Sequence, residues 1–164
     1  MTNTLIYRPL SHSGDYSPSY ATSKEAQTLI TRIRAWLSST ARAYSLRGQA
    51  ERELADTFLD SRDENWDGYG ACPIADASFL RAQALLARLL NRFPAPTASA
   101  TPNGSLTLEW ILNPQRRFML SVDGDEQIAY AGVFGDETVQ GVAQFVCDVP
   151  REIIAQLSRL YYNA

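Results

Sequence analysis

The sequence predicts an α+β fold with N-terminal helices, one mid-chain helix, an antiparallel meander of three to four strands and a C-terminal helix. Two observations support this class. Apolar residues recur at helical spacing before residue 60, from 76 to 93 and after 150. Between 106 and 145 they alternate with polar residues instead, and short turns interrupt the alternation. Strands joined by such short turns are antiparallel neighbours, so the helices should cover one face of a single sheet.

The first 60 residues are expected to form an arm followed by helices. Residues 1–21 lack periodicity and predict a flexible N-terminal arm, whereas 22–164 predict a single α+β domain. Thr22 and Glu25 form a capping-box pattern at the start of the helical part, residues 22–60. The apolar stripe loses phase near Gly48, a poor helix former, which favours two segments at about 23–46 and 49–60.

A central loop at residues 61–75 separates the helical part from the helix-sheet-helix core at 76–164. It combines glycines that permit positive φ with two large aromatic residues and a fixed exit at Pro73. We expect a structural loop whose aromatic side chains anchor the helices to the sheet, with Asp67 forming an Asx turn. Its members are Asn65, Trp66, Asp67, Gly68, Tyr69 and Gly70.

The core region begins with a helix that Asp76 can cap and that Pro94 and Pro96 stop. A turn at 102–105 leads into alternating strands near 106–112, 118–122 and 128–134, and residues 138–145 suggest a fourth. Pro150 then opens an amphipathic C-terminal helix.

Composition excludes several classes. With 45% apolar and 20% charged residues the chain is globular, and no apolar run approaches bilayer length, so no membrane partner is expected. The N-terminus lacks the apolar segment of a secretory signal, and the two cysteines are isolated, which together indicate a cytoplasmic protein. The net charge of −3 creates no general attraction for nucleic acid.

Part of the central loop matches the first half of a calcium-binding loop. Asp63, Asn65 and Asp67 alternate, and Gly68 follows at the sixth position. The twelfth position, which needs a bidentate carboxylate, is Ile74. We therefore expect no metal and no cofactor, and these three residues are the nearest ligand candidates.

An enzymatic alternative is a metal-dependent hydrolase or nuclease in which Asp67 and Glu109 hold the metal. Glu109 faces opposite to Leu108 and Trp110, toward solvent or a cleft. Its competing interpretation is an exposed strand glutamate that pairs with Arg116 or Arg117 across the hairpin. His12, the only histidine, lies in the arm, so a Ser-His-Asp or Cys-His mechanism lacks a base. The sequence favours a non-enzymatic protein.

The first helical segment is a candidate partner-binding element. Trp36 and Tyr44 lie on its broad apolar stripe, and Arg34 lies among several arginines. The chain has one lysine and fourteen arginines, and arginine is enriched at protein interfaces. Binding of nucleic acid by these arginines is a second alternative, against which stands their role as a solvated helix face.

Three motifs carry a resemblance over about residues 60–162. They are the N-W-D-G-Y-G-A loop at 65–71, the L-E-W strand at 108–110 and the Y-A-G-x-F-G strand at 130–135. In these motifs the chain resembles a loosely defined group of small uncharacterised bacterial proteins. The resemblance implies a bacterial defence or mobile-element neighbourhood, and hence a protein partner encoded nearby. The resulting hypothesis is a protein-binding module of the antitoxin, immunity or accessory-subunit kind.

Overall fold

The computed structural model describes residues 24–162, and for 25–26, 29, 36 and 39–44 it describes only their place in a helix. The chain divides into two compact units, residues 1–38 and 39–164. The second unit contains the sheet and the core. The predicted arm at 1–21 and the Thr22 cap lie outside the described residues, so the predicted division into arm and single domain stays a prediction.

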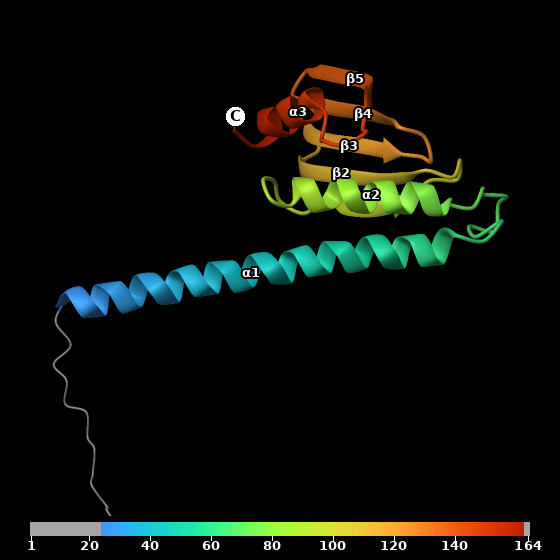
Figure 1. Cartoon of the computed structure of the whole chain (residues 1–164). Helices are drawn as coiled ribbons and strands as arrows, with labels where there is room; N and C mark the ends of the chain where they lie inside the picture. The colour runs from blue at the N-terminus through green and yellow to red at the C-terminus, as the bar shows by residue number, and fades with distance from the viewer. Residues whose placement is uncertain (1–23, 163–164) are drawn as a thin grey trace, which may run out of the picture. The chain divides into compact units, whose positions relative to one another are not determined.

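The described elements are three helices and five strands. In chain order they are α1 (Lys24–Ser61), α2 (Asp76–Leu89), β1 (Thr97–Ala100), β2 (Leu106–Asn113), β3 (Arg116–Val122), β4 (Gln127–Phe134), β5 (Glu137–Gln144) and α3 (Arg151–Tyr162). The strands form one antiparallel sheet in the order β1-β2-β3-β4-β5 (Figure 1). The predicted α+β class and the meander are confirmed, and β1 is an additional strand.

One face of the sheet carries the core. Its side chains are at most 1% exposed from Leu106 to Trp110 on β2 and from Phe118 to Val122 on β3 at alternate positions. Helices α2 and α3 contact the sheet, and their buried leucines and isoleucines join the same hydrophobic cluster as Ala50 and Leu54 of α1. The expectation that the helices cover one face of the sheet is therefore met by α2 and α3.

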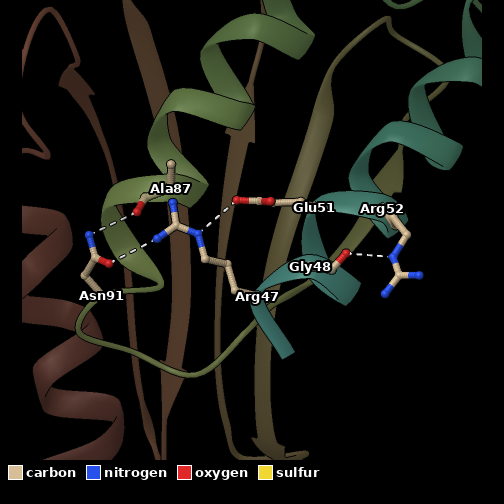
Figure 2. A network of polar contacts seen from close by, with 6 residues as sticks. All are labelled: Arg47, Gly48, Glu51, Arg52, Ala87 and Asn91. Atoms are coloured by element: carbon tan, nitrogen blue, oxygen red, sulfur yellow. Dashed lines mark hydrogen bonds and ion pairs between the residues drawn. The ribbon is translucent and has the colours of Figure 1, made fainter. Parts of the chain in front are cut away.

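Helix α1 is continuous through Gly48, so the predicted break there is wrong. Glycine costs a helix about 1 kcal/mol relative to alanine, but neighbouring residues fix this turn in place. Arg47 Nε lies 3.0 Å from Glu51 Oε1, and its NH1 donates to Asn91 Oδ1 beyond α2 at 3.3 Å. Arg52 Nε donates to the Gly48 carbonyl oxygen at 2.9 Å (Figure 2). The bond from Arg47 to Asn91 and the burial of Ala50 and Leu54 in the core thus override the local propensity.

The ends of α2 and α3 are stabilised in ways that differ from the sequence expectation. The N-cap of α2 is Ala75, without a side-chain cap, and Asp76 lies in the first turn, where its charge complements the helix dipole. The prediction of Asp76 as the cap is wrong. At the C-terminal end of α3, Arg116 NH2 of β3 donates to the carbonyl oxygens of Arg159 and Leu160 at 3.0 and 2.8 Å. This guanidinium satisfies carbonyls that a helix end leaves without partners.

Candidate functional site

The central loop is closed on itself by hydrogen bonds of Asn65 and Asp67. Asn65 has a positive φ of 58°, its N–H donates to Ala71 O at 2.9 Å, and its Oδ1 accepts from Gly70 N at 2.7 Å. Asp67 Oδ1 accepts from Tyr69 N at 2.8 Å and from Ala71 N at 3.1 Å. The first of these two bonds is an Asx turn. Asn65 Oδ1 and Asp67 Oδ1, one oxygen of each candidate ligand, are thus engaged by the loop's own backbone.

The metal candidates do not form a cluster. Within residues 24–162, no group of three or more His, Cys, Asp or Glu side chains could hold a metal ion. Asp63 is exposed at the start of the loop. Asp67 serves the loop backbone, whereas Glu109 lies at the centre of β2, opposite Met119 of β3.

The two aromatic residues of the loop have different roles. Trp66 is half-buried, and its Nε1–H donates to Cys72 O at 3.1 Å. The indole ring therefore binds the backbone near the C-terminal end of the loop. Tyr69 is 96% exposed, so the expectation that it anchors the helices to the sheet is wrong. The loop is instead fixed by its backbone, because Cys72 N donates to Pro102 O and Ile74 N donates to Ser61 O.

The face of the sheet opposite the core, which we call the open face, presents the other set of alternating side chains. Across strands β2 to β5 it consists of Thr107, Glu109, Ile111, Arg117, Met119, Ser121, Gln127, Ala129, Ala131, Val133, Thr138, Gln140, Val142 and Gln144. Only Glu109 and Arg117 among these carry a charge. Ile111, Met119 and Val142 are 59%, 39% and 62% exposed. Apart from Thr107, which is 6% exposed, the open face is accessible, and it is largely uncharged.

A trough runs along β4 on the open face. The strand register places Ala131 between Met119 of β3 and Gln140 of β5, and Ala129 between Ser121 and Val142. Because alanine is short, the longer neighbours rise on either side of β4. Two adjoining hollows of about 250 and 480 Å³ result, and both are lined by Met119, Ala131 and Gln140.

Glu109 faces opposite to Leu108 and Trp110, as the alternation predicted, and so lies on the open face. It lines the smaller hollow together with Arg117. Among residues 24–162 the ion pairs are Arg47–Glu51 and Arg159–Glu137, so neither charge of the open face belongs to an ion pair there. Two unpaired opposite charges beside an apolar trough can orient a bound molecule, whereas Asp67 contributes nothing to this site.

The partner-binding residues predicted on the first helix, Arg34, Trp36 and Tyr44, all lie on α1. Arg34 is exposed, and its carbonyl oxygen accepts a hydrogen bond from Ser38 Oγ at 2.8 Å. The side chains of Trp36 and Tyr44 lie outside the described residues. Ile30, Ile33 and Leu37 on the same helical segment are exposed, so this part of α1 keeps an accessible apolar stripe of its own.

Sequence reasoning missed the open face as a site, although its signal was present. The alternation that assigned Leu106, Leu108 and Trp110 to the core also assigns every second residue to the other face. What the alternation lacks is the register, which alone brings Met119, Ala131 and Gln140 into one row.

Comparison of the chain with protein-family models, curated proteins and solved structures finds no match. None of the helices formed by residues 24–162 combines the length and the apolarity needed to cross a membrane. The function proposed for this chain therefore rests on its own geometry and sequence motifs.

Proposed function

We propose that this chain is a non-enzymatic protein-binding module that receives its partner on the open face of its sheet. The observation that carries the proposal is the composition of that face. An antiparallel sheet with one solvated face ordinarily shows polar side chains there. Six side chains of this face are apolar, among them the exposed Ile111, Met119 and Val142, and only two are charged, the other polar side chains being neutral. Depletion of charge at an accessible surface is the compositional mark of an interface core.

The shape of the open face supports the same proposal. The trough along β4 offers a concave apolar floor of Ala129 and Ala131 between the taller side chains of β3 and β5. Large apolar side chains of a partner can enter such a trough, as anchor residues do at the centres of interfaces. Glu109 and Arg117 at one side would fix the partner's orientation by charge.

The resemblance to small bacterial proteins narrows the kind of module we propose. It would be an antitoxin, an immunity protein or an accessory subunit of a defence or mobile-element system, acting in the cytoplasm on a protein encoded nearby. The Asn65–Gly70 segment would then have a structural role, since its polar atoms hold the loop closed.

Affinity purification from the native host tests this proposal with two matched variants. Met119→Lys places a charge in the trough, whereas Leu80→Lys places one on a leucine of α2 on the other side of the sheet, where the side chain is 61% exposed against 39% for Met119. We expect one protein to co-purify with the wild type and with Leu80→Lys, and to be lost with Met119→Lys. The purified partner should then bind the wild type directly. Equal recovery with all three baits, or recovery with none, would overturn the proposal.

The non-enzymatic part of the proposal is tested by thermal unfolding with magnesium, manganese and calcium salts. A metal that binds the folded state raises the unfolding midpoint by mass action. We expect no rise beyond that of a matched sodium chloride control. A specific rise that Asp67→Asn or Glu109→Gln abolishes would instead favour the metal-dependent hydrolase.

A further inference from the structure

The two edges of the sheet are built differently. β1, at one edge, has four residues and directly follows Pro96. The N–H of Ala98 on this strand donates to Glu53 Oε1 of α1 at 3.0 Å. A short strand beside a proline, with its backbone bonded by a side chain, is a protected edge that cannot readily accept another strand.

β5, at the other edge, carries none of these protections. It has eight residues, Glu137–Gln144, without proline or lysine, and its register with β4 is regular over its whole length. Its one charged residue, Glu137, is bound by Arg159 of α3 through two side-chain hydrogen bonds. β5 forms the upper edge of the sheet in Figure 1, and β4 is its only strand neighbour among the described residues.

Half of the backbone groups of β5 point away from β4. The two-residue turn at 135–136 closes on the pair Phe134–Glu137, so alternate residues from Glu137 onward bond to β4 and the residues between them point outward. The outward set includes Thr138, Gln140 and Val142. Within residues 24–162, no hydrogen bond reaches the outward N–H and C=O groups of these three residues. Such a row of groups is a template for a further strand.

We propose that β5 pairs antiparallel with β5 of a second copy of this chain, with Gln140 on the twofold axis. A twofold axis perpendicular to the sheet makes two identical edge strands antiparallel, and it keeps the open faces of both copies on the same side. Paired residues must then share a face, so Gln140 lies opposite Gln140, and Thr138 opposite Val142. These pairs all belong to the outward set, and together they supply six backbone hydrogen bonds, within the range of specific interfaces of about 10 ± 5.

The distribution of charge along β5 suits a second copy as the occupant. In this register Glu137 lies opposite Ala143 of the second copy, and the two Glu137 residues lie at opposite ends of the strand pair. No like charges therefore meet, although the two strands are identical. The opposed pairs Thr138–Val142 combine β-branched side chains, which pack well across neighbouring strands.

The dimer would join two five-stranded sheets into one of ten strands. Its open faces would form one continuous surface, with a trough on each side of the axis formed by Met119, Ala131 and Gln140. This inference does not depend on the proposed function, because a dimer can form whether or not another protein binds. It does predict that a partner meets two symmetry-related sites.

Sedimentation of the full chain over a range of concentrations tests the proposal. We expect a concentration-dependent monomer–dimer equilibrium for the wild type. Gln140→Lys places two like charges opposite each other and should raise the dissociation constant by about tenfold or more. Gln127→Lys adds the same charge to the same face on inner strand β4, and should leave the dissociation constant within about twofold of wild type.

A charge-swap experiment identifies the axis residue. Gln140→Lys and Gln140→Glu should each be monomeric where the wild type is dimeric, and an equimolar mixture of the two should dimerise again. Only a contact of residue 140 with residue 140 of the second copy gives this rescue. Thermal unfolding midpoints close to wild type would show that the single variants are folded.

Three results would overturn the proposal. The wild type could be monomeric at every concentration, or Gln140→Lys could dimerise as well as Gln127→Lys. The third is a dimer that Ile33→Lys abolishes and Gln140→Lys preserves, because it would assign self-association to the exposed stripe of α1. None of these results bears on the Met119→Lys purification, so the failure of the dimer and the failure of the proposed function are distinguishable.

Discussion

One alternating sequence pattern determines the side chains of both faces of the sheet, but the two faces have different surroundings. On β3, Phe118 and Leu120 are fully buried, whereas Met119 between them is 39% exposed. The buried set is packed by α2 and α3, and the exposed set lines a trough that no helix of residues 39–162 fills. Neighbouring residues of comparable size thus serve stability on one face and, in our proposal, recognition on the other. This difference can be tested by comparing a variant on the core face with a variant on the open face.

The largest difference is expected between Trp110→Ala and Met119→Ala. Trp110 is 1% exposed, its ring lies 6.4 Å from that of Phe118, and its Nε1–H donates to Pro94 O at 2.8 Å. Its truncation should lower the free energy of unfolding by about 3–5 kcal/mol. Met119→Ala should lower it by less than about 1 kcal/mol. Chemical denaturation monitored by circular dichroism measures both, and similar losses would show that the open face is also a packed face.

A smaller difference is expected between two glycines. A Cβ on Gly132 of β4 would lie 2.8 Å from Phe134 Cε2 and 2.9 Å from Phe118 Cδ2, both on the core face. Gly132→Ala forces these rings to move and should destabilise the protein by about 1–3 kcal/mol.

Gly48→Ala provides the matched control in helix α1. A Cβ there meets no atom within 4 Å, so the gain in helix propensity should stabilise the protein by about 1 kcal/mol. The two changes are compared by the denaturant midpoint at constant slope. A stable Gly132→Ala protein would mean that the core face is looser around Phe118 than its burial indicates.

These residues also show how much of the fold can be predicted from the sequence. Alternation predicted β2 to β5 and the burial of Trp110, because side-chain direction in a strand has a fixed period. It did not predict β1, whose Thr97-Ala98-Ser99-Ala100 segment has no large apolar residue and whose edge is held by Glu53 from α1. Nor did it predict an unbroken α1. The low helix propensity of Gly48 is a local property, whereas the hydrogen bond from Arg47 to Asn91 joins residues far apart in the sequence.

The candidate site was predictable only in part for the same reason. The alternation predicted that Glu109 faces away from the core. The trough, however, exists because the strand register places Ala131 between Met119 and Gln140. The exposure of Tyr69 likewise depends on how the loop backbone closes, through Asn65 and Asp67, rather than on the residue type. Strand pairing is a long-range property, and residue patterns do not encode it directly.

The smallest expected effect concerns the ion pair that links the edge of the sheet to α3. The hydrogen bonds from Arg159, and then its charge, hold the pKa of Glu137 below its ordinary value. A carboxylate with a lowered pKa in the folded state stabilises the protein above its unfolded pKa of about 4.3, and this contribution is lost as the pH falls through the folded pKa. Because the pair is exposed, it is screened by salt and contributes little.

Thermal unfolding of the wild type and Glu137→Gln between about pH 7 and pH 3 measures this contribution. We expect the variant to have a slightly lower midpoint at neutral pH and low salt, and the difference to vanish in acid or at high salt. Glu126→Gln, at an exposed carboxylate without an ion pair among residues 24–162, should show no such pH-dependent difference. A difference that persists in acid would mean that Glu137 supports the end of β5 through packing rather than charge. In that case the Glu137–Arg159 pair would not be what holds this edge strand against α3.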